Sequence, residues 1–75
     1  MMNIVATKTV LGGKPRIAGT RISVGLVMSY IINGYSYKEI KRDYPQLTDE
    51  QVENARRYFE KNPERFNLDL EKAQN

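Results

Sequence analysis

The chain has 75 residues, with 12 Lys or Arg against 9 Asp or Glu, and therefore a net charge of +3. It contains neither Cys nor His, which excludes a disulfide framework, a thiolate nucleophile, a Ser-His pair and most zinc sites. A domain of this size buries only about 60% of its unfolded surface, so we expect it to form a homodimer. Because Cys and His are absent, we expect a cytoplasmic, non-enzymatic protein that holds no cofactor.

Charge is distributed unevenly along the chain. Seven basic residues and one acidic residue lie up to Arg42, whereas five basic and eight acidic residues follow from Asp43. A basic front half suits a phosphate backbone and an acidic end suits a protein partner, although solvated surface charge is the commoner explanation of any single run. No apolar stretch approaches the roughly 20 residues of a membrane span, so we expect no membrane partner.

The first 23 residues predict a small β element. Residues 1–11 alternate weakly between apolar and polar positions, as a poor strand does. Gly19 occupies the position of a type II turn that needs a positive φ, which predicts a hairpin with arms 14–17 and 20–23. Two strands alone are barely stable, so this ribbon should pack on the helices or pair with the ribbon of a second copy.

Residues 24–33 predict a helix that is apolar on nearly every side. Ser23 is a suitable N-cap, and Gly34 is a suitable left-handed closing residue. A helix without a polar face has to be buried all round. In so short a chain, we expect one of its faces to meet a second copy.

Two helix-start signatures follow in tandem. Ser36 with Glu39, and Thr48 with Gln51, have the spacing of capping boxes, in which each side chain bonds the other residue's backbone N–H. Pro45 lies between them and must end the first of these helices. The pair predicts a helix-turn-helix, the geometry of many DNA-reading domains, although a bare pair of short helices is about equally often plain scaffold.

After this pair, the sequence predicts a tail. Pro63 suits the first position of a short C-terminal helix, on which Phe66, Leu70 and Ala73 share an apolar face. We expect these residues to contact a partner, with Phe66 and Leu70 as its binding residues, and to lie outside the fold. The chain thus divides into a β element over 1–23, a three-helix core over 24–61 and a tail over 62–75, all within one helix-turn-helix domain spanning 1–75.

Basic and amide side chains provide candidate DNA contacts. Asn54 and Arg57 on the third helix have the chemistry to read adenine or guanine edges. Asp49, Glu50 and Glu53 at the start of that helix complement its dipole but repel phosphates, so we expect electrostatic backbone contacts to dominate. The candidate DNA-binding residues are Lys14, Arg16, Arg21, Lys38, Lys41, Arg42, Asn54 and Arg57.

Three strings of residues carry a family resemblance. They are Gly13-Lys-Pro15-Arg-Ile17-Ala-Gly19-Thr20-Arg21-Ile22-Ser-Val24, then Gly34-Tyr-Ser36 with Glu39-Ile40, then Tyr44-Pro45-Gln-Leu47-Thr48 with Gln51-Val52. Across about residues 4–60 the chain resembles the domain-of-unknown-function family 433. The resemblance implies a mainly α, homeodomain-like three-helix helix-turn-helix domain with a short N-terminal β-hairpin and a short C-terminal helix.

That family includes VapB-type antitoxins, whose partners are PIN-type ribonuclease toxins. The resemblance therefore implies a DNA-binding antitoxin-like regulator of a type II toxin-antitoxin operon, which binds its own operator and neutralises such a toxin. The alternative is a protein-protein interaction module that uses the same fold without touching DNA. A remote third interpretation is metal-assisted hydrolysis by Asp49 and Glu53, which lie one helical turn apart.

Overall fold

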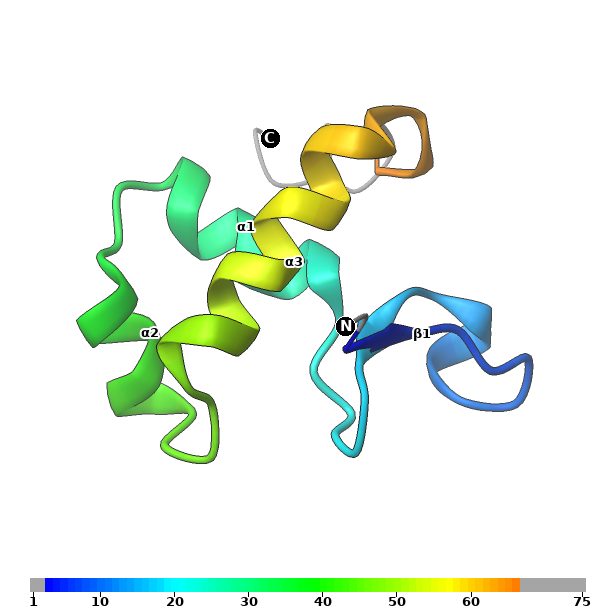
Figure 1. Ribbon diagram of the computed structural model, residues 1–75, viewed down its shortest axis with the longest axis horizontal. Coiled ribbons are helices and arrows are strands. Elements are labelled where there is room, and N and C mark those ends of the chain that lie inside the picture. Colours follow the sequence, from blue (N-terminus) through cyan, green and yellow to red (C-terminus); the bar gives the residue numbers. More distant parts are fainter. Residues whose placement is uncertain (1–2, 67–75) are drawn as a thin grey trace.

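The structure, a computed structural model, describes residues 3–66 of the chain. Within that range it is mainly helical, with three α-helices and a two-stranded antiparallel sheet (Figure 1), as the sequence predicts. No helix among these residues is long and apolar enough to cross a membrane. The elements are β1 (Ile4–Val5), the 3-10 helix η1 (Leu11–Gly13), β2 (Arg16–Ile17), α1 (Val24–Ile32), α2 (Tyr37–Asp43), α3 (Asp49–Lys61) and the 3-10 helix η2 (Pro63–Arg65).

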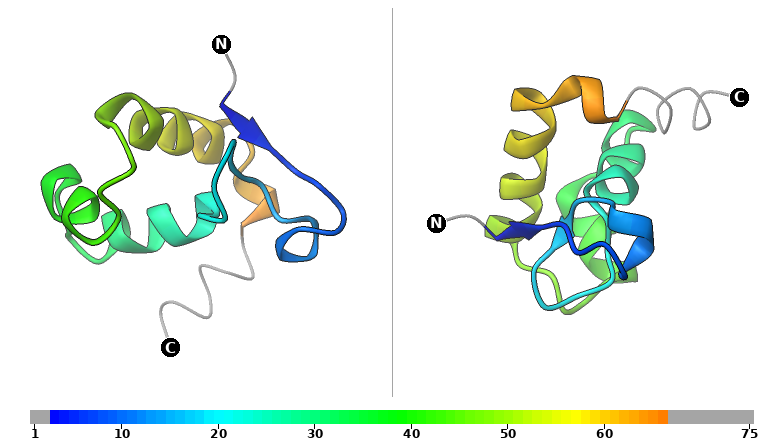
Figure 2. Two further views of the ribbon diagram at one scale, coloured as in Figure 1. Left: turned by 90° about the horizontal axis from the view of Figure 1, so that it is seen from below. Right: turned by 90° about the vertical axis from the view of Figure 1, so that its right-hand side faces the viewer.

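The helices form two layers. Helices α1 and α3 lie side by side and make the most extensive packing in the molecule, α2 closes one end of the pair, and the β element lies at the opposite end (Figures 1 and 2). The core fills the space between these elements, and no polar side chain among residues 3–66 is buried in it. Its apolar members are Ile4, Ile17, Ile22, Val24, Val27, Met28, Ile40, Leu47, Val52, Ala55 and Phe66.

Both predicted capping boxes are confirmed. The Ser36 hydroxyl accepts a 3.2 Å bond from the Glu39 N–H, and the Glu39 carboxylate accepts a 2.9 Å bond from the Ser36 N–H. The Ser36 N–H, and to a smaller extent the Ser36 side chain, stabilise the Glu39 carboxylate and lower the pKa of Glu39. Thr48 and Gln51 make the equivalent bonds of 3.1 and 2.9 Å at the start of α3. The two helix starts are therefore fixed by local chemistry alone.

Helix α1 also begins and ends as predicted. The Ser23 hydroxyl accepts a 3.0 Å bond from the Leu26 N–H. At the other end Gly34 has a φ of +90°, and the Tyr35 N–H bonds the Tyr30 carbonyl at 3.0 Å, which is the pattern of a Schellman motif. The expectation that α1 is buried all round is not met within the single chain, because Ile32 remains 46% exposed.

The β element is only partly as predicted. The type II turn is present, since the Thr20 N–H bonds the Ile17 carbonyl at 3.1 Å and Gly19 has a φ of +80°. The predicted arms 14–17 and 20–23 do pair antiparallel, through a bridge between Arg16 and Ser23 and a 2.9 Å bond from the Ile17 N–H to the Ile22 carbonyl, although the second arm does not form a regular strand. The regular strand partner of β2 is β1, with Ile4 opposite Ile17, and this pairing was not predicted. It buries Ile4 against the core.

The expectation that the segment from Phe66 onward lies outside the fold is also wrong at its first residue. Phe66 is only 2% exposed, and its ring packs against those of Tyr58 and Phe59, with centroids 6.0 and 5.3 Å apart. Proline at the start of η2 turns the chain back after α3, and this places the ring against the core. Leu70 and the rest of the predicted tail helix lie outside the described residues.

Candidate functional site

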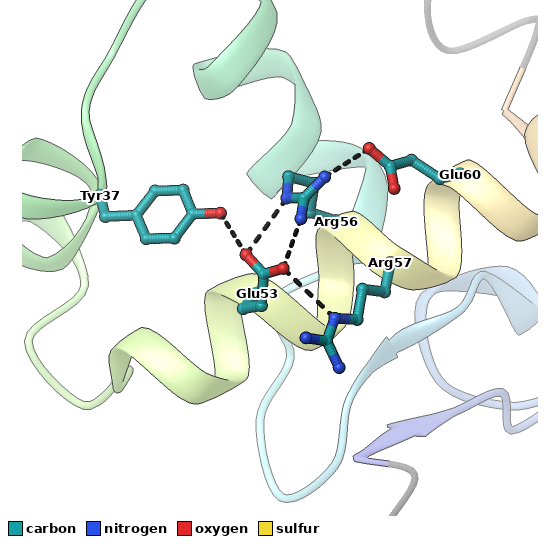
Figure 3. A network of polar contacts seen from close by, with 5 residues as sticks. All are labelled: Tyr37, Glu53, Arg56, Arg57 and Glu60. Atoms are coloured by element: carbon teal, nitrogen blue, oxygen red, sulfur yellow. Dashed lines mark hydrogen bonds and ion pairs between the residues drawn. The ribbon is translucent and has the colours of Figure 1, made fainter.

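A network of charged side chains centres on Glu53, in the middle of α3 (Figure 3). Its Oε1 accepts a 2.7 Å hydrogen bond from the Tyr37 hydroxyl of α2 and a 3.2 Å bond from Nε of Arg56. Its Oε2 accepts bonds from Nη2 of Arg56 and, at 3.2 Å, from Nε of Arg57. Arg56 also bonds Glu60 one turn later. Glu53 therefore holds two arginines and a neighbouring helix at once.

The network is strongly coupled electrostatically. Hydrogen bonds from Arg56, and then from Tyr37, lower the pKa of Glu53 to about 2. Burial, followed by the bond to Glu53, raises the pKa of the Tyr37 hydroxyl, and the bond to Glu53 raises the pKa of Arg56 further. All of these groups keep their neutral-pH charge states well into acid and base. Both oxygens of the Glu53 carboxylate are thus occupied by structural hydrogen bonds, and this argues against a hydrolytic pair of Glu53 with Asp49.

Beside the network lies an open pocket of 460 Å³ between the start of β1 and the second half of α3. It is lined by two cationic side chains, three amides, one tyrosine and one aliphatic residue: Arg57, Lys61, Asn3, Asn54, Asn62, Tyr58 and Ile4. Asn62 is held there because its Nδ2 donates a 3.0 Å bond to the Tyr58 carbonyl. The pocket gathers hydrogen-bond donors and positive charge in one place.

Two of the predicted DNA-binding residues meet in this pocket. Asn54 and Arg57, expected on the exposed face of α3, both line it, and Asn54 is half-buried. The residues that sequence reasoning missed are Asn3, Tyr58, Lys61 and Asn62. Part of this set could have been found from the sequence, because positions 54, 57, 58 and 61 have the spacing of residues on one face of a helix. Asn3 joins them only through the pairing of β1 with β2, which the sequence pattern did not reveal.

The other predicted DNA contacts are scattered, and several have structural partners. Arg16 is half-buried and donates to the Thr20 carbonyl at 3.1 Å and to the Thr7 hydroxyl at 3.0 Å, so it ties the β element together. Lys41 pairs with Asp49, and Arg42 lies 3.7 Å from Glu39. Lys14, Arg21 and Lys38 have exposed side chains.

A second cluster lies where α1 meets α2. The ring of Tyr30 packs edge-on against those of Tyr35 and Tyr44, with centroids 5.1 and 6.0 Å apart. Its hydroxyl donates a 2.9 Å bond to Asp43, and this bond is the main reason that the pKa of Tyr30 rises to about 12. A shallow hollow of 210 Å³ opens beside them. Residues 3–66 contain no group of three acidic side chains placed to hold a metal ion.

Two comparisons relate the chain to known proteins. It is similar to a DUF433 member protein from Anabaena variabilis whose crystal structure is known, with a TM-score of 0.83 and 35% sequence identity over 100% of this chain and 71% of that one. No curated protein matches it. The model of the family described as "Protein of unknown function (DUF433)" matches residues 4–59, which is three quarters of the sequence and includes α1, α2 and most of α3. The chain therefore belongs to the DUF433 family.

Proposed function

We propose that this protein is a DNA-binding, antitoxin-like regulator of a type II toxin-antitoxin operon, which neutralises a PIN-type ribonuclease toxin. The observation that carries the DNA-binding half is the α2–turn–α3 pair. Two short helices are joined by a connection of five residues, and each start is fixed by a complete capping box. A rigid pair of this kind is the element that homeodomain-like helix-turn-helix proteins present to DNA.

The charges favour contact with the phosphate backbone more than base reading. The turn at 17–20 and the α2–α3 connection both point to the lower side of the molecule in Figure 1, and exposed Arg21 follows that turn. Lys38 and Arg42 are exposed on α2. By contrast Arg57, the best candidate for a guanine contact, is bonded to Glu53 through Nε. We therefore expect binding that is mostly electrostatic and strongly dependent on salt.

The toxin-binding half of the proposal is carried by the family resemblance and the acidic end of the sequence. Because the Phe66 side chain belongs to the core, the toxin would be contacted by residues beyond it, such as Leu70, which lies outside the described residues. In this function the protein acts as a homodimer in the cytoplasm and needs no cofactor.

One observation favours the alternative, a protein-protein interaction module. The first turn of α3 carries Asp49 and Glu50, and the two arginines of the same helix are paired with carboxylates. A recognition helix with this charge pattern repels DNA where it would have to approach most closely. A protein partner need not carry negative charge where it contacts this helix.

A salt titration separates the two functions. Fluorescence anisotropy is measured with labelled DNA from upstream of the protein's own gene and with a scrambled duplex, from about 50 mM salt upward. For the regulator, log K should fall against log salt with a slope of about 0.9 per phosphate neutralised. Arg21→Ala and Lys38→Ala should each reduce that slope by about one unit per copy that contacts phosphate.

Arg65→Ala is the matched control, because Arg65 is exposed on η2, far from the α2–α3 connection in Figure 1. It should leave the slope unchanged. A slope that falls equally for all three variants would mean that only overall charge matters. No binding to either duplex at low salt would reject the regulator and favour the interaction module.

A further inference from the structure

The pocket between β1 and α3 has the size and chemistry of a small-molecule site. Its 460 Å³ falls within the range of about 300 to 1,000 Å³ that is usual for such sites. Within residues 3–66 no carboxylate lines it, whereas Arg57 and Lys61 do. A lining with this charge selects against cations and favours an anion.

Arg57 is held in place before any ligand arrives. Glu53 accepts only its Nε, at 3.2 Å, and the two terminal nitrogens point away from that carboxylate (Figure 3). Neither terminal nitrogen has a hydrogen-bond partner among the described residues. Glu53 is itself held by Tyr37 and Arg56, so its bond to Nε favours one orientation of the Arg57 side chain, which is 66% exposed. The free edge of the guanidinium is suited to bidentate binding of an oxyanion.

The second cation determines which oxyanion fits best. Lys61 lies one helical turn after Arg57, so it adds an ammonium group to the same side of α3. A carboxylate brings one negative charge, whereas a phosphate monoester brings about −1.5 to −2 at pH 7 and three acceptor oxygens. Two cations in one pocket therefore match a monoester better than a carboxylate.

The rest of the lining fits a small organic group on that phosphate. Tyr58 offers an aromatic ring that packs edge-to-face with Phe66, at a centroid distance of 6.0 Å. Asn3 and Asn54 offer amides that both donate and accept hydrogen bonds. We propose that this pocket binds a phosphate monoester of nucleotide size, with the phosphate on Arg57 and Lys61 and the organic group toward Tyr58 and the amides.

Nuclear magnetic resonance titration of the labelled full chain tests this inference directly. The probes are adenosine monophosphate, ribose 5-phosphate, inorganic phosphate and adenosine, each added to protein without DNA. We expect adenosine monophosphate to shift the amides of residues 54–62 and Ile4 saturably, with a dissociation constant on the order of 1 mM or lower. Inorganic phosphate should move the same signals more weakly, and adenosine should bind weakest.

Three variants assign the contacts. Arg57→Gln and Lys61→Gln should each weaken binding of adenosine monophosphate by tenfold or more, as expected when a charged hydrogen bond to phosphate is lost. Arg57→Lys keeps the charge but removes the planar fork, so it should restore binding only in part. Arg65→Gln removes an exposed cation outside the pocket and should change the affinity less than twofold.

The inference fails if no probe shifts these amides saturably, if the shifts centre on the basic β element, or if Arg65→Gln weakens binding as much as Arg57→Gln. A short DNA duplex supplies phosphate diesters and forms a separate arm. If the duplex shifts the pocket amides while adenosine monophosphate does not, the proposed DNA-binding function stands and the monoester site is rejected. If adenosine monophosphate shifts the pocket amides while the duplex shifts signals near Arg21 and Lys38, both proposals stand. If adenosine monophosphate shifts them and the duplex shifts no signal at all, the site stands and the DNA-binding function is rejected.

Discussion

The hydroxyl of Tyr37, at the start of α2, donates a 2.7 Å hydrogen bond to Oε1 of Glu53, in the middle of α3. A second link between the same helices is the ion pair of Lys41 with Asp49. Ile40 of α2 and Val52 of α3 are both fully buried, so these polar links lie beside an apolar contact and not in place of one. The geometry of the α2–α3 pair therefore depends on a named hydrogen bond as well as on packing.

Replacing Tyr37 with Phe should weaken that geometry. The change keeps the ring and removes only the hydroxyl, so it should cost about 1 kcal/mol in the free energy of unfolding, the usual net value of one such bond. Urea denaturation measures it. Tyr35→Phe is the control, since Tyr35 is 48% exposed and its hydroxyl has no bond in the network. Equal losses in both variants would contradict a specific role for the Tyr37 hydroxyl.

Glu53 should make stability depend on pH in acid. Its pKa in the folded protein is about 2, below its ordinary value of 4.5, so its contribution is complete above about pH 4.5. That contribution is lost as pH falls from about 4.5 toward about 2, because the folded state must then protonate a carboxylate that its partners hold ionised. The thermal unfolding temperature should therefore decrease less steeply from about pH 6 to pH 3 for Glu53→Gln than for the wild type. Glu64→Gln replaces an exposed carboxylate outside the network and should leave the slope close to that of the wild type.

Phe66 should be a major contributor to stability. Phe66→Ala removes a ring that is 2% exposed and contacts both aromatic residues at the end of α3, so it should cost about 3 to 5 kcal/mol. The neighbouring Arg65→Ala should stay within about 0.5 kcal/mol, because Arg65 is exposed. Urea denaturation compares the two. A small effect of Phe66→Ala on stability would contradict a core role for Phe66 and favour a contact with a partner.

Features set by neighbouring residues were predictable from the sequence. The two capping boxes, the Ser23 cap and the positive φ of Gly19 and Gly34 each depend on chemistry within about five residues, and all are present. The buried positions of α1 and α3 follow equally well, because they recur at helical spacing within each helix: Val24, Val27 and Met28 in α1, and Val52 and Ala55 in α3.

Features set by distant residues were not predictable. Ile4 pairs with Ile17 across a connection of ten residues between β1 and β2, and nothing local in the sequence indicates this partner in addition to the nearer arm at 20–23. The Phe66 ring packs back against Tyr58 and Phe59 at the end of α3. The helical spacing of Phe66 and Leu70 instead indicated a separate tail helix. The pocket needs Asn3 and Ile4 beside α3, and the pairing of β1 with β2 brings them there, so only the α3 side of the pocket could be predicted from the sequence.

Gly19 should be sensitive to backbone strain and not to side-chain size alone. Its φ is +80°, and an added Cβ would meet nothing within 4 Å, so any cost of substitution is conformational. Gly19→Ala should cost about 1 to 2 kcal/mol, Gly19→Asn less and Gly19→Val more, because Asn tolerates a left-handed backbone and a β-branched residue does not. Thermal denaturation of the three variants gives the order. A ranking by volume, with Ala mildest, would contradict this explanation.

Dimerisation should depend on the exposed end of α1. Ile32 is 46% exposed at the last turn of a helix whose other apolar residues pack on the core, and the 48% exposed Tyr35 follows it. An exposed apolar pair on a domain with so small a core gives a second copy a reason to bind. Analytical ultracentrifugation at micromolar concentration should therefore detect a dimer.

Ile32→Lys should convert that dimer into a monomer, because it would bury an unpaired charge in the contact. The isolated chain should remain folded, since the side chain of Ile32 is not part of the core. Gln46→Lys introduces the same charge at an exposed position in the α2–α3 connection and should leave the dimer intact. Circular dichroism of each variant separates loss of association from loss of folding. A wild-type protein that is a stable monomer at these concentrations, or an Ile32→Lys variant that still dimerises, would rule out this face of α1 as the interface.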